Sequence, residues 1–225
     1  SGRWLAQTGT SLRAIMSCGS LYDDLASRRV RDAYGIEVAN AYGQTETTGI
    51  VMCEPLGSYR LNRMAPPLAG VRQHFRELGE GVFELGIEYD HAFVGYLGQH
   101  RRNDPVVWTG DLVTRRVDGI EFKGRAGHAI KTMTGEGWLF PDRVEAWIRE
   151  CTDLGDAAVR PLPDHSGLWC VVNARTVPDD LRQRIVSALG PAYASLRIYP
   201  GQVRRTPSGK LLDMVPAADL KGIPI

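Results

Sequence analysis

The sequence lacks the features that mark several classes of protein. Its 225 residues carry a formal net charge of +1, which gives no bulk electrostatic case for binding nucleic acid or an anionic membrane. No apolar run approaches the roughly 18 residues that a membrane-spanning helix needs. The opening SGRWLAQTG lacks the basic and apolar regions of a signal peptide. We therefore expect a cytoplasmic protein with no nucleic-acid partner and no membrane partner.

Closely spaced cysteines are also missing. Cys18, Cys53, Cys151 and Cys170 lie far apart, and no CxxC pair occurs. In a chain of this size the spacing favours reduced thiols over a disulfide framework. The apolar content of 43% is enough for a sizeable core in one or two domains. Because position 1 is serine, we expect a processed product or a fragment.

The first 55 residues predict an α/β unit. LRAIMS (12–17) is a strand candidate, and Ser20 can cap a helix over residues 21–34 that Gly35 ends. IEVAN (36–40) is a second strand, and AYGQTETTG (41–49) follows it as a loop. In α/β sheets, ligands bind just past the carboxyl ends of strands. We therefore expect ligand-binding or catalytic residues in this loop.

The rest of the chain contains two segments that differ in their sequence pattern. Between residues 50 and 123, Pro and Gly separate short runs such as VFELGIEY and IEFKG, which is typical of small antiparallel β structure. Beyond Gly124, helices over 141–151 and 178–190 alternate with strand candidates, which predicts a compact α+β domain. Those strand candidates are DAAVRPL, LWCVVNA, SLRIYP and QVRRT. We predict domains at 1–124, divided into pieces 1–55 and 56–124, and at 125–225.

Four segments carry polar residues suited to a site. YGQTET is followed by WTGDL (108–112) with Asp111, by GRAGHAIK (124–131) with Arg125 and Lys131, and by RRTPSGK (204–210) with Lys210. Each alone has an ordinary explanation: a capped helix start, a turn, or an exposed loop with a solvated lysine. Because all four segments occur together in this order, we expect them to serve one common function.

Together these segments resemble the adenylate-forming enzymes, which include acyl- and aryl-CoA synthetases, luciferases and the adenylation domains of peptide synthetases. The matching motifs are SCGS, NAYGQTE, GEGVFELG, WTGDL, GR with a lysine six residues on, PDRVE and RTPSGK. They cover nearly the whole chain and correspond to the second half of the family's usual length. YGQTET is closer to the acyl- and aryl-CoA synthetases than to the YGPTE of peptide synthetases.

The resemblance implies a fold and an activity. The fold is α/β plus α+β: a remnant of the large N-terminal α/β domain with a β-barrel-like subdomain, then a small mobile α+β domain. The activity is ATP-dependent conversion of a carboxylic acid to an acyl-adenylate, followed by transfer to a thiol. The implied cofactors are ATP, Mg²⁺ and CoA or phosphopantetheine, so CoA or an acyl carrier protein is the expected partner.

The resemblance also implies roles for individual residues. Tyr42 would lie against the adenine, Thr45 would bond the α-phosphate, Glu46 would ligate Mg²⁺, and Lys210 would place its charge between the acid and the α-phosphate. Asp111 would accept from both ribose hydroxyls. The implied nucleotide-binding residues are Gly19, Ser20, Asn40, Ala41, Tyr42, Gly43, Thr45, Asp111, Arg125 and Lys131, and the implied catalytic residues are Lys210, Thr45 and Glu46.

The sequence departs from the family pattern in ways that matter. The family's lysine-bearing, Gly-, Ser- and Thr-rich phosphate loop is missing, and no GxxxxGK replaces it. Gly127 stands where the hinge usually has Asp or Lys, Arg143 where Glu is common, and Asp213 where a basic residue often follows. We therefore expect an incomplete ATP site, in a fragment or in one part of a split enzyme that needs a complementing chain. Such a chain alone should be inactive and should expose apolar surface, so that it self-associates or needs a partner.

Two alternatives stay open at this point. The first is a non-catalytic relic that binds nucleotide, a carrier protein or another chain. The second is a generic α/β protein whose motifs match by chance. A phosphate loop upstream in the same gene or its neighbour favours the enzyme, whereas a true start codon near Ser1 with no such neighbour favours the relic.

Overall fold

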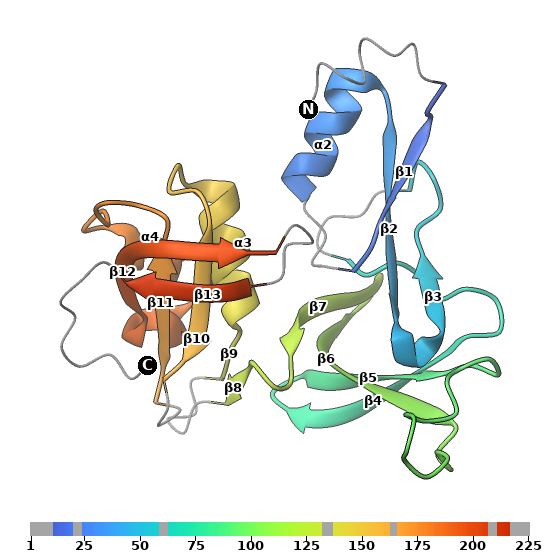
Figure 1. The fold of residues 1–225 in the computed structure, drawn as a ribbon. Helices are drawn as coiled ribbons and strands as arrows, with labels where there is room; N and C mark the ends of the chain where they lie inside the picture. Colours follow the sequence, from blue (N-terminus) through green and yellow to red (C-terminus); the bar gives the residue numbers. More distant parts are fainter. Residues whose placement is uncertain are drawn as a thin grey trace. The chain divides into compact units, whose positions relative to one another are not determined.

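The computed structural model describes residues 11–19, 24–58, 63–131, 137–162, 166–206 and 211–216, and Figure 1 traces the chain through them. Contacts divide the chain into two compact units, residues 1–122 and 123–225, which are described separately below. The fold is mixed α/β and rich in sheet, which confirms the predicted fold class. In the described ranges no helix has the length and apolar character to cross a bilayer.

The first unit begins with a three-stranded sheet in the order β1-β2-β3. β1 (Ala14–Ser17) pairs in parallel with β2 (Glu37–Gln44), which pairs antiparallel with β3 (Gly49–Cys53). Helix α2 (Asp24–Tyr34) connects β1 to β2. Gly35 ends the helix with a left-handed φ of +64°, and its N–H donates to the carbonyl of Arg31 at 2.8 Å.

The predicted loop at residues 41–49 is wrong for its first part, because β2 continues to Gln44. Gly43 explains the extension. A Cβ at Gly43 would lie 1.9 Å from the carbonyl oxygen of Gly49, so only glycine lets β3 approach β2 this closely. The strand therefore carries Tyr42 and Gln44 to the point where the chain turns.

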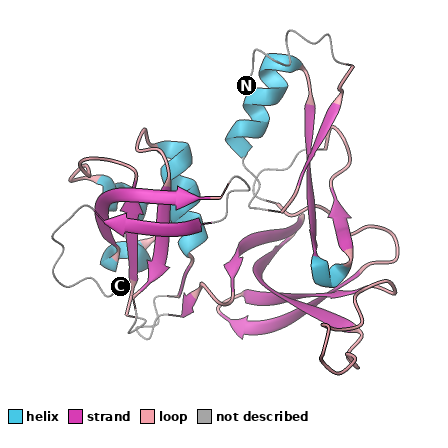
Figure 2. Ribbon diagram, viewed as in Figure 1, coloured by secondary structure: helices cyan, strands magenta, loops and turns pink. Residues whose placement is uncertain are grey.

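A second sheet of the first unit has four strands in the order β4-β5-β6-β7 (Figure 2). The first three form an antiparallel meander, as predicted for residues 50–123. Buried side chains that include Met52, Leu85, Ile87 and Val113 form the core of this unit. The strand bounds are Arg72–Gly79 for β4, Val82–Glu88 for β5, Val106–Arg116 for β6 and Gly119–Arg125 for β7.

The second unit is an α+β structure, as predicted. Its sheet has the order β10-β11-β12-β13, with β11 and β12 parallel and the outer pairs antiparallel. All five residues of β11 (Leu168–Val172) are buried. The remaining elements are β8 (Ile130–Lys131), β9 (Trp138–Leu139), α3 (Pro141–Cys151), β10 (Ala157–Pro161), α4 (Leu181–Leu189), the 3₁₀ turn η2 (Pro191–Ser195), β12 (Arg197–Arg205) and β13 (Leu211–Pro216).

Two predictions for this unit need correction. SLRIYP and QVRRT form one strand, β12, that passes through Pro200 and Gly201. A Cβ at Gly201 would lie 2.2 Å from the carbonyl oxygen of Val215, so the glycine permits close strand pairing here and does not mark a turn. β13, which pairs with this strand, was not predicted.

Candidate functional site

The turn that follows β2 presents Thr45 and Glu46. Residues Thr45–Thr47 form a 3₁₀ helix, η1. Its buried third residue, Thr47, accepts the N–H of Gln44 at 2.9 Å, and its hydroxyl, with one proton to donate, lies 3.0 Å from the carbonyl oxygen of Gln44 and 2.8 Å from that of Gly49. These bonds fix the turn from within. Thr45 is exposed and Glu46 is half-buried on this turn.

Tyr42 and Asp111 meet although 69 positions separate them in the sequence. The Tyr42 hydroxyl donates to Asp111 Oδ2 at 2.6 Å. Gln44 Nε2 donates to the same oxygen at 2.8 Å and to the carbonyl of Thr109 at 3.1 Å. Sequence reasoning missed the role of Gln44, since nothing in the local pattern shows that β2 lies beside β6.

Asp111 lies within β6, which continues to Arg116 beyond the WTGDL motif. The residue is only 1% exposed. Its backbone N–H donates to Thr109 Oγ1 at 3.1 Å, and that hydroxyl donates to the carbonyl of Leu85 at 2.8 Å. In this arrangement the carboxylate is shielded from solvent and binds its neighbours in the protein.

Asn40 and Ala41 lie on β2 just before this cluster. Asn40 Nδ2 donates to the carbonyl of Arg63 at 3.3 Å, and the Asn40 carbonyl accepts the N–H of Glu54 at 2.9 Å. Ala41 is buried. Ser17 of β1 is paired with Asn40, so the exposed Gly19 follows β1 at the same sheet edge. Ser20 lies outside the described residues.

Glu46 also contacts the loop between β5 and β6. The Tyr96 hydroxyl donates to the Glu46 carboxylate, and this bond is the main reason that the pKa of Tyr96 lies above its ordinary value. No group of three or more His, Cys, Asp or Glu side chains is placed to hold a metal in the part of the chain that the structure describes. Mg²⁺ is commonly held by one or two carboxylates together with substrate phosphates and water. A single carboxylate such as Glu46 fits that kind of site.

The remaining predicted residues follow residue 122, where the boundary between the two units falls within β7. Arg125 ends β7 and is exposed, and its carbonyl accepts from the N–H groups of His128 and Ala129 at 2.9 and 2.8 Å. The Lys131 ammonium lies 5.8 Å from the centroid of the Trp138 ring. A Cβ at Gly127 would meet nothing within 4 Å, so no steric reason requires glycine at that position. Lys210 lies outside the described residues.

A cluster of ion pairs holds the chain just before the segment that carries Lys210. Arg205, the last residue of β12, donates to Asp156 at 2.5 Å, to Glu145 at 3.0 Å and to the carbonyl of Ala157 at 2.7 Å. Burial raises the pKa of Asp156, but the hydrogen bonds with Arg205 and their charge outweigh it and hold the pKa below its ordinary value. Glu145 Oε1 accepts the N–H of Val159 at 2.9 Å, which ties helix α3 to β10.

Comparison with known proteins finds no matching protein-family model. The chain is 25% identical over 171 residues to a 3-hydroxybenzoate--CoA/4-hydroxybenzoate--CoA ligase of Thauera aromatica, covering 70% of this chain and 32% of that protein. It is 24% identical over 229 residues to 4-hydroxybutyrate--CoA ligase 1 of Metallosphaera sedula, covering 89% and 40%. It is 28% identical over 176 residues to N-(5-amino-5-carboxypentanoyl)-L-cysteinyl-D-valine synthase of Amycolatopsis lactamdurans, covering 66% and 5%. The chain therefore spans less than half the length of these curated relatives.

Solved structures share the fold. A benzoate CoA ligase from Burkholderia xenovorans LB400 superposes with a TM-score of 0.74 at 18% identity, covering 94% of this chain and 48% of that one. An o-succinylbenzoate coenzyme A synthetase from Bacillus subtilis, in complex with ATP and magnesium ion, gives 0.76 at 18% identity, covering 93% and 48%.

Proposed function

We propose that this chain, which belongs to the adenylate-forming superfamily, is the C-terminal part of a ligase that activates a carboxylic acid as its acyl-adenylate and passes the acyl group to a thiol. Two of the curated relatives are named as CoA ligases of hydroxy acids, which favours an aryl or acyl acid and CoA. The third is named as a synthase of a peptide, so carrier-bound phosphopantetheine is the other candidate acceptor.

The observation that carries the proposal is the meeting of Tyr42 and Asp111 beside the η1 turn. Two motifs far apart in sequence, NAYGQTE and WTGDL, contribute to one hydrogen-bonded cluster. Tyr42 supplies a ring for an adenine face, and a carboxylate such as Asp111 can accept from two ribose hydroxyls. We assign the base to the segment Asn40–Gly43 with Gly19 and Ser20, and we assign the ribose to Asp111 and Arg125.

The buried state of Asp111 adds a condition to this assignment. The carboxylate is 1% exposed and accepts from both Tyr42 and Gln44. Both of these bonds go to Oδ2, so burial of the carboxylate is what keeps a ribose away, and a ribose can reach it only if the side chains that cover it move. We therefore propose that nucleotide binding opens the Tyr42–Gln44–Asp111 cluster.

The remaining residues act on the phosphates and the acid. Thr45 donates its hydroxyl to the α-phosphate, and Glu46 holds Mg²⁺. When bound, Mg²⁺ supplies positive charge against the phosphate oxygens. An oxygen of the substrate carboxylate attacks the α-phosphorus and pyrophosphate leaves, while the Lys210 ammonium offsets the negative charge that builds there.

Transfer completes the cycle. The thiol sulfur bonds to the acyl carbon, AMP leaves with the bonding electrons, and the thiol proton passes to solvent. We assign Lys131 a place near the adenylate or the incoming thiol.

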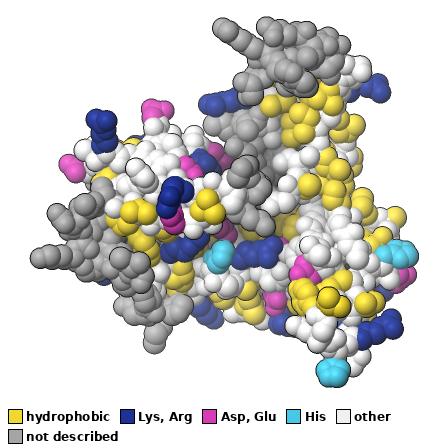
Figure 3. All heavy atoms as spheres, in the orientation of Figure 1, with side chains coloured by type: hydrophobic (Ala, Val, Ile, Leu, Met, Phe, Trp, Pro, Cys, Tyr) yellow, Lys and Arg dark blue, Asp and Glu magenta, His cyan; other side chains and the backbone are white. Residues whose placement is uncertain are grey.

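Binding of the outer phosphates needs groups that residues 1–225 do not show, since no Gly-, Ser- and Thr-rich loop with a lysine occurs in the printed sequence. We propose that a segment outside these residues, or a complementing chain, supplies them. Apolar exposure on β1 supports this proposal. Met16 is 54% exposed and the neighbouring Leu12 is 43% exposed, and yellow side chains gather over this part of the first unit (Figure 3). A packed neighbour would cover them.

The test is acid-dependent exchange of pyrophosphate into ATP, measured for residues 1–225 and for the whole gene product. The panel should contain aryl, short hydroxy and amino acids. We expect exchange with one acid class in the whole product, and inactivity with concentration-dependent self-association for residues 1–225. Robust exchange by residues 1–225 would remove the need for a complementing segment.

One observation favours a second candidate, a non-catalytic relic that binds nucleotide or a carrier protein. The Asp111 carboxylate is shielded by its own protein neighbours. If the whole product binds AMP but shows no exchange with any acid, the relic is the better account.

A further inference from the structure

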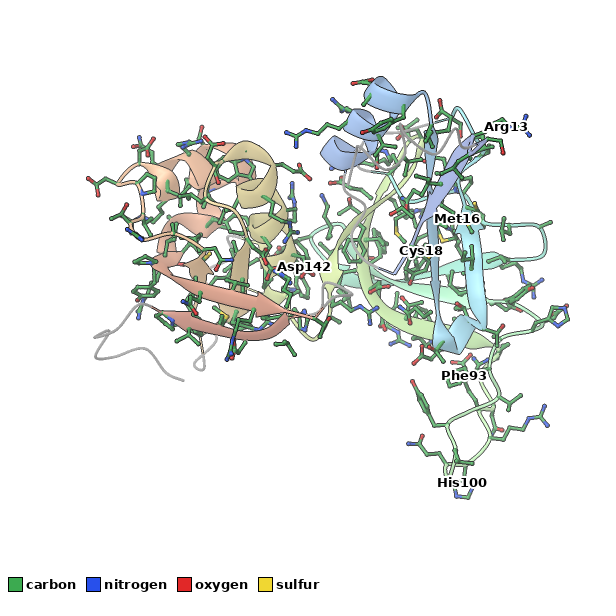
Figure 4. All side chains as sticks on the ribbon, turned by 45° about the horizontal axis from the view of Figure 1, so that its top comes forward. Arg13, Met16, Cys18, Phe93, His100 and Asp142 are labelled. Carbon is green, nitrogen blue, oxygen red and sulfur yellow. The ribbon has the colours of Figure 1, made fainter. Side chains whose placement is uncertain are left out.

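The loop between β5 and β6 folds back on itself. Within this loop the N–H of Gln99 donates to the carbonyl of Tyr96 at 3.1 Å, and the N–H of Arg102 donates to the carbonyl of Val94 at 2.8 Å. Gly95 and Gly98 allow the reversal with φ of +146° and +82°. The segment that carries Phe93 and His100 extends away from the sheets of the first unit (Figure 4). It nevertheless has a defined internal structure.

Two contacts dock this loop onto the η1 turn without Tyr96. The N–H of Phe93 donates to the carbonyl of Glu46 at 3.0 Å. The hydroxyl of Thr48 donates to the carbonyl of His91 at 2.6 Å. Both contacts use the loop's main chain, so they hold for any side chain at position 96.

The direction of the Tyr96 ring is set inside the loop. The Phe93 ring lies edge-on to the Tyr96 ring, with centroids 5.1 Å apart and an interplanar angle of 72°, which is a favourable aromatic geometry. The Arg102 guanidinium carbon lies 5.5 Å from the centroid of the Phe93 ring. This stack points the Tyr96 hydroxyl at the Glu46 carboxylate, to which it donates.

We propose that Tyr96 is a positioning residue whose hydroxyl orients the Glu46 carboxylate to take the divalent cation that accompanies the nucleotide. The inference rests on the proposed function, because it assumes that Glu46 is the metal ligand. Tyr96 is 52% exposed, and the loop is docked by main-chain contacts, so its hydroxyl is not needed for burial or docking. The Tyr96 hydroxyl therefore acts on the orientation of the Glu46 carboxylate. Loss of such a supporting hydrogen bond typically lowers metal affinity by about 10- to 100-fold.

The experiment measures Mn²⁺ binding to the whole gene product in the presence of ATP, by the electron paramagnetic resonance spectrum of bound Mn²⁺. Tyr96→Phe removes only the hydroxyl and Glu46→Gln removes the ligand charge. Tyr89→Phe, which changes a tyrosine at the start of the same loop, is the control. ATP affinity is measured separately in EDTA, where a change in metal positioning has no effect.

We expect Tyr96→Phe to weaken Mn²⁺ binding by about tenfold or more and to alter the spectrum of the bound ion, with ATP affinity in EDTA unchanged. Tyr89→Phe should match the wild type. In a Glu46→Gln background, Tyr96→Phe should add no further loss, because Tyr96 acts only through that carboxylate.

The outcomes separate two failures. If Glu46→Gln weakens Mn²⁺ binding and Tyr96→Phe does not, the positioning role is wrong and the proposed function stands. If Tyr96→Phe lowers ATP affinity in EDTA, or adds its loss to that of Glu46→Gln, Tyr96 acts on the fold or on the nucleotide and the proposal is also wrong. If the wild type shows no saturable Mn²⁺ binding, or Glu46→Gln leaves it intact, the metal role of Glu46 falls, and the inference falls with it.

Discussion

Replacing Arg205 with methionine should destabilise the second unit strongly. The variant keeps most of the side-chain length but leaves Asp156 and Glu145 without the guanidinium that bonds both. Removing one partner of a fully buried ion pair costs about 3–5 kcal/mol, and the low end applies here because the Arg205 and Asp156 side chains are 20% and 24% exposed. We expect about 3 kcal/mol, because Arg149 still lies 3.3 Å from Asp156 and Arg160 lies 3.9 Å from Glu145.

Urea unfolding followed by circular dichroism measures this loss. With a slope of about 1.5 kcal/mol per M for a unit of roughly 100 residues, the midpoint should fall by about 2 M. Hydrogen exchange should show the lost protection in β10 and β12. Arg204→Met is the matched control, since the neighbouring Arg204 is exposed and pairs with Asp213 at the surface, and it should shift the midpoint far less.

The pH dependence gives a second check. Because the native pKa of Asp156 is lowered, its stabilising contribution is present above the unfolded pKa of about 3.9 and is lost as the pH falls through the native value. The gap between wild type and Arg205→Met should therefore shrink at acid pH. Equal midpoints for Arg205→Met and Arg204→Met, or a gap that does not change with pH, would refute this account of the cluster.

The first unit offers two further predictions. Asp111→Ala removes the acceptor of the Tyr42 hydroxyl and the Gln44 amide in a buried site, so it should lower the free energy of unfolding by about 2–4 kcal/mol and weaken AMP binding. Tyr42→Phe should lower the free energy of unfolding by only about 1 kcal/mol and should keep AMP binding. Urea unfolding and AMP titration check both variants. Wild-type stability for Asp111→Ala would contradict the buried cluster. Gly43→Ala would place a methyl group 1.9 Å from the Gly49 carbonyl and should prevent correct folding. Gly127→Ala, which meets nothing within 4 Å, should melt within about 0.5 kcal/mol of wild type, and equal stability of the two alanine variants would be inconsistent with the close β2–β3 approach.

The local pattern of the sequence was sufficient where an element repeats regularly. Helix α3 (Pro141–Cys151) begins and ends where its proline and its spacing of apolar residues predict. Strand β5 (Val82–Glu88) matches its predicted apolar run to within one residue. In these segments a side chain's burial follows from its position in the element, so local spacing carries the information.

Local pattern failed where pairing between distant strands decides the structure. The end of β2 reads as a loop because Tyr42 and Gln44 are polar, but they face a polar cluster on β6 and belong to a strand. SLRIYP and QVRRT were predicted as two strands, yet β12 passes through Pro200 and Gly201 because another strand needs the space that a glycine leaves. Tyr96 was not identified because its partner lies 50 positions earlier. Each case depends on a neighbour that the local sequence does not contain.

The central claim is a two-step ligase in which Lys210 serves only the first step, and one measurement tests it most directly. Lys210→Ala in the whole gene product should be assayed in rapid mixing for each half-reaction separately, with synthetic acyl-adenylate as the substrate of the second. Loss of one positioned charge typically lowers the rate by about 10²–10³. The account predicts a fall of that size in acyl-adenylate formation, with transfer from the synthetic adenylate to the thiol preserved. An equal fall in both half-reactions, or a fall in neither, would contradict it.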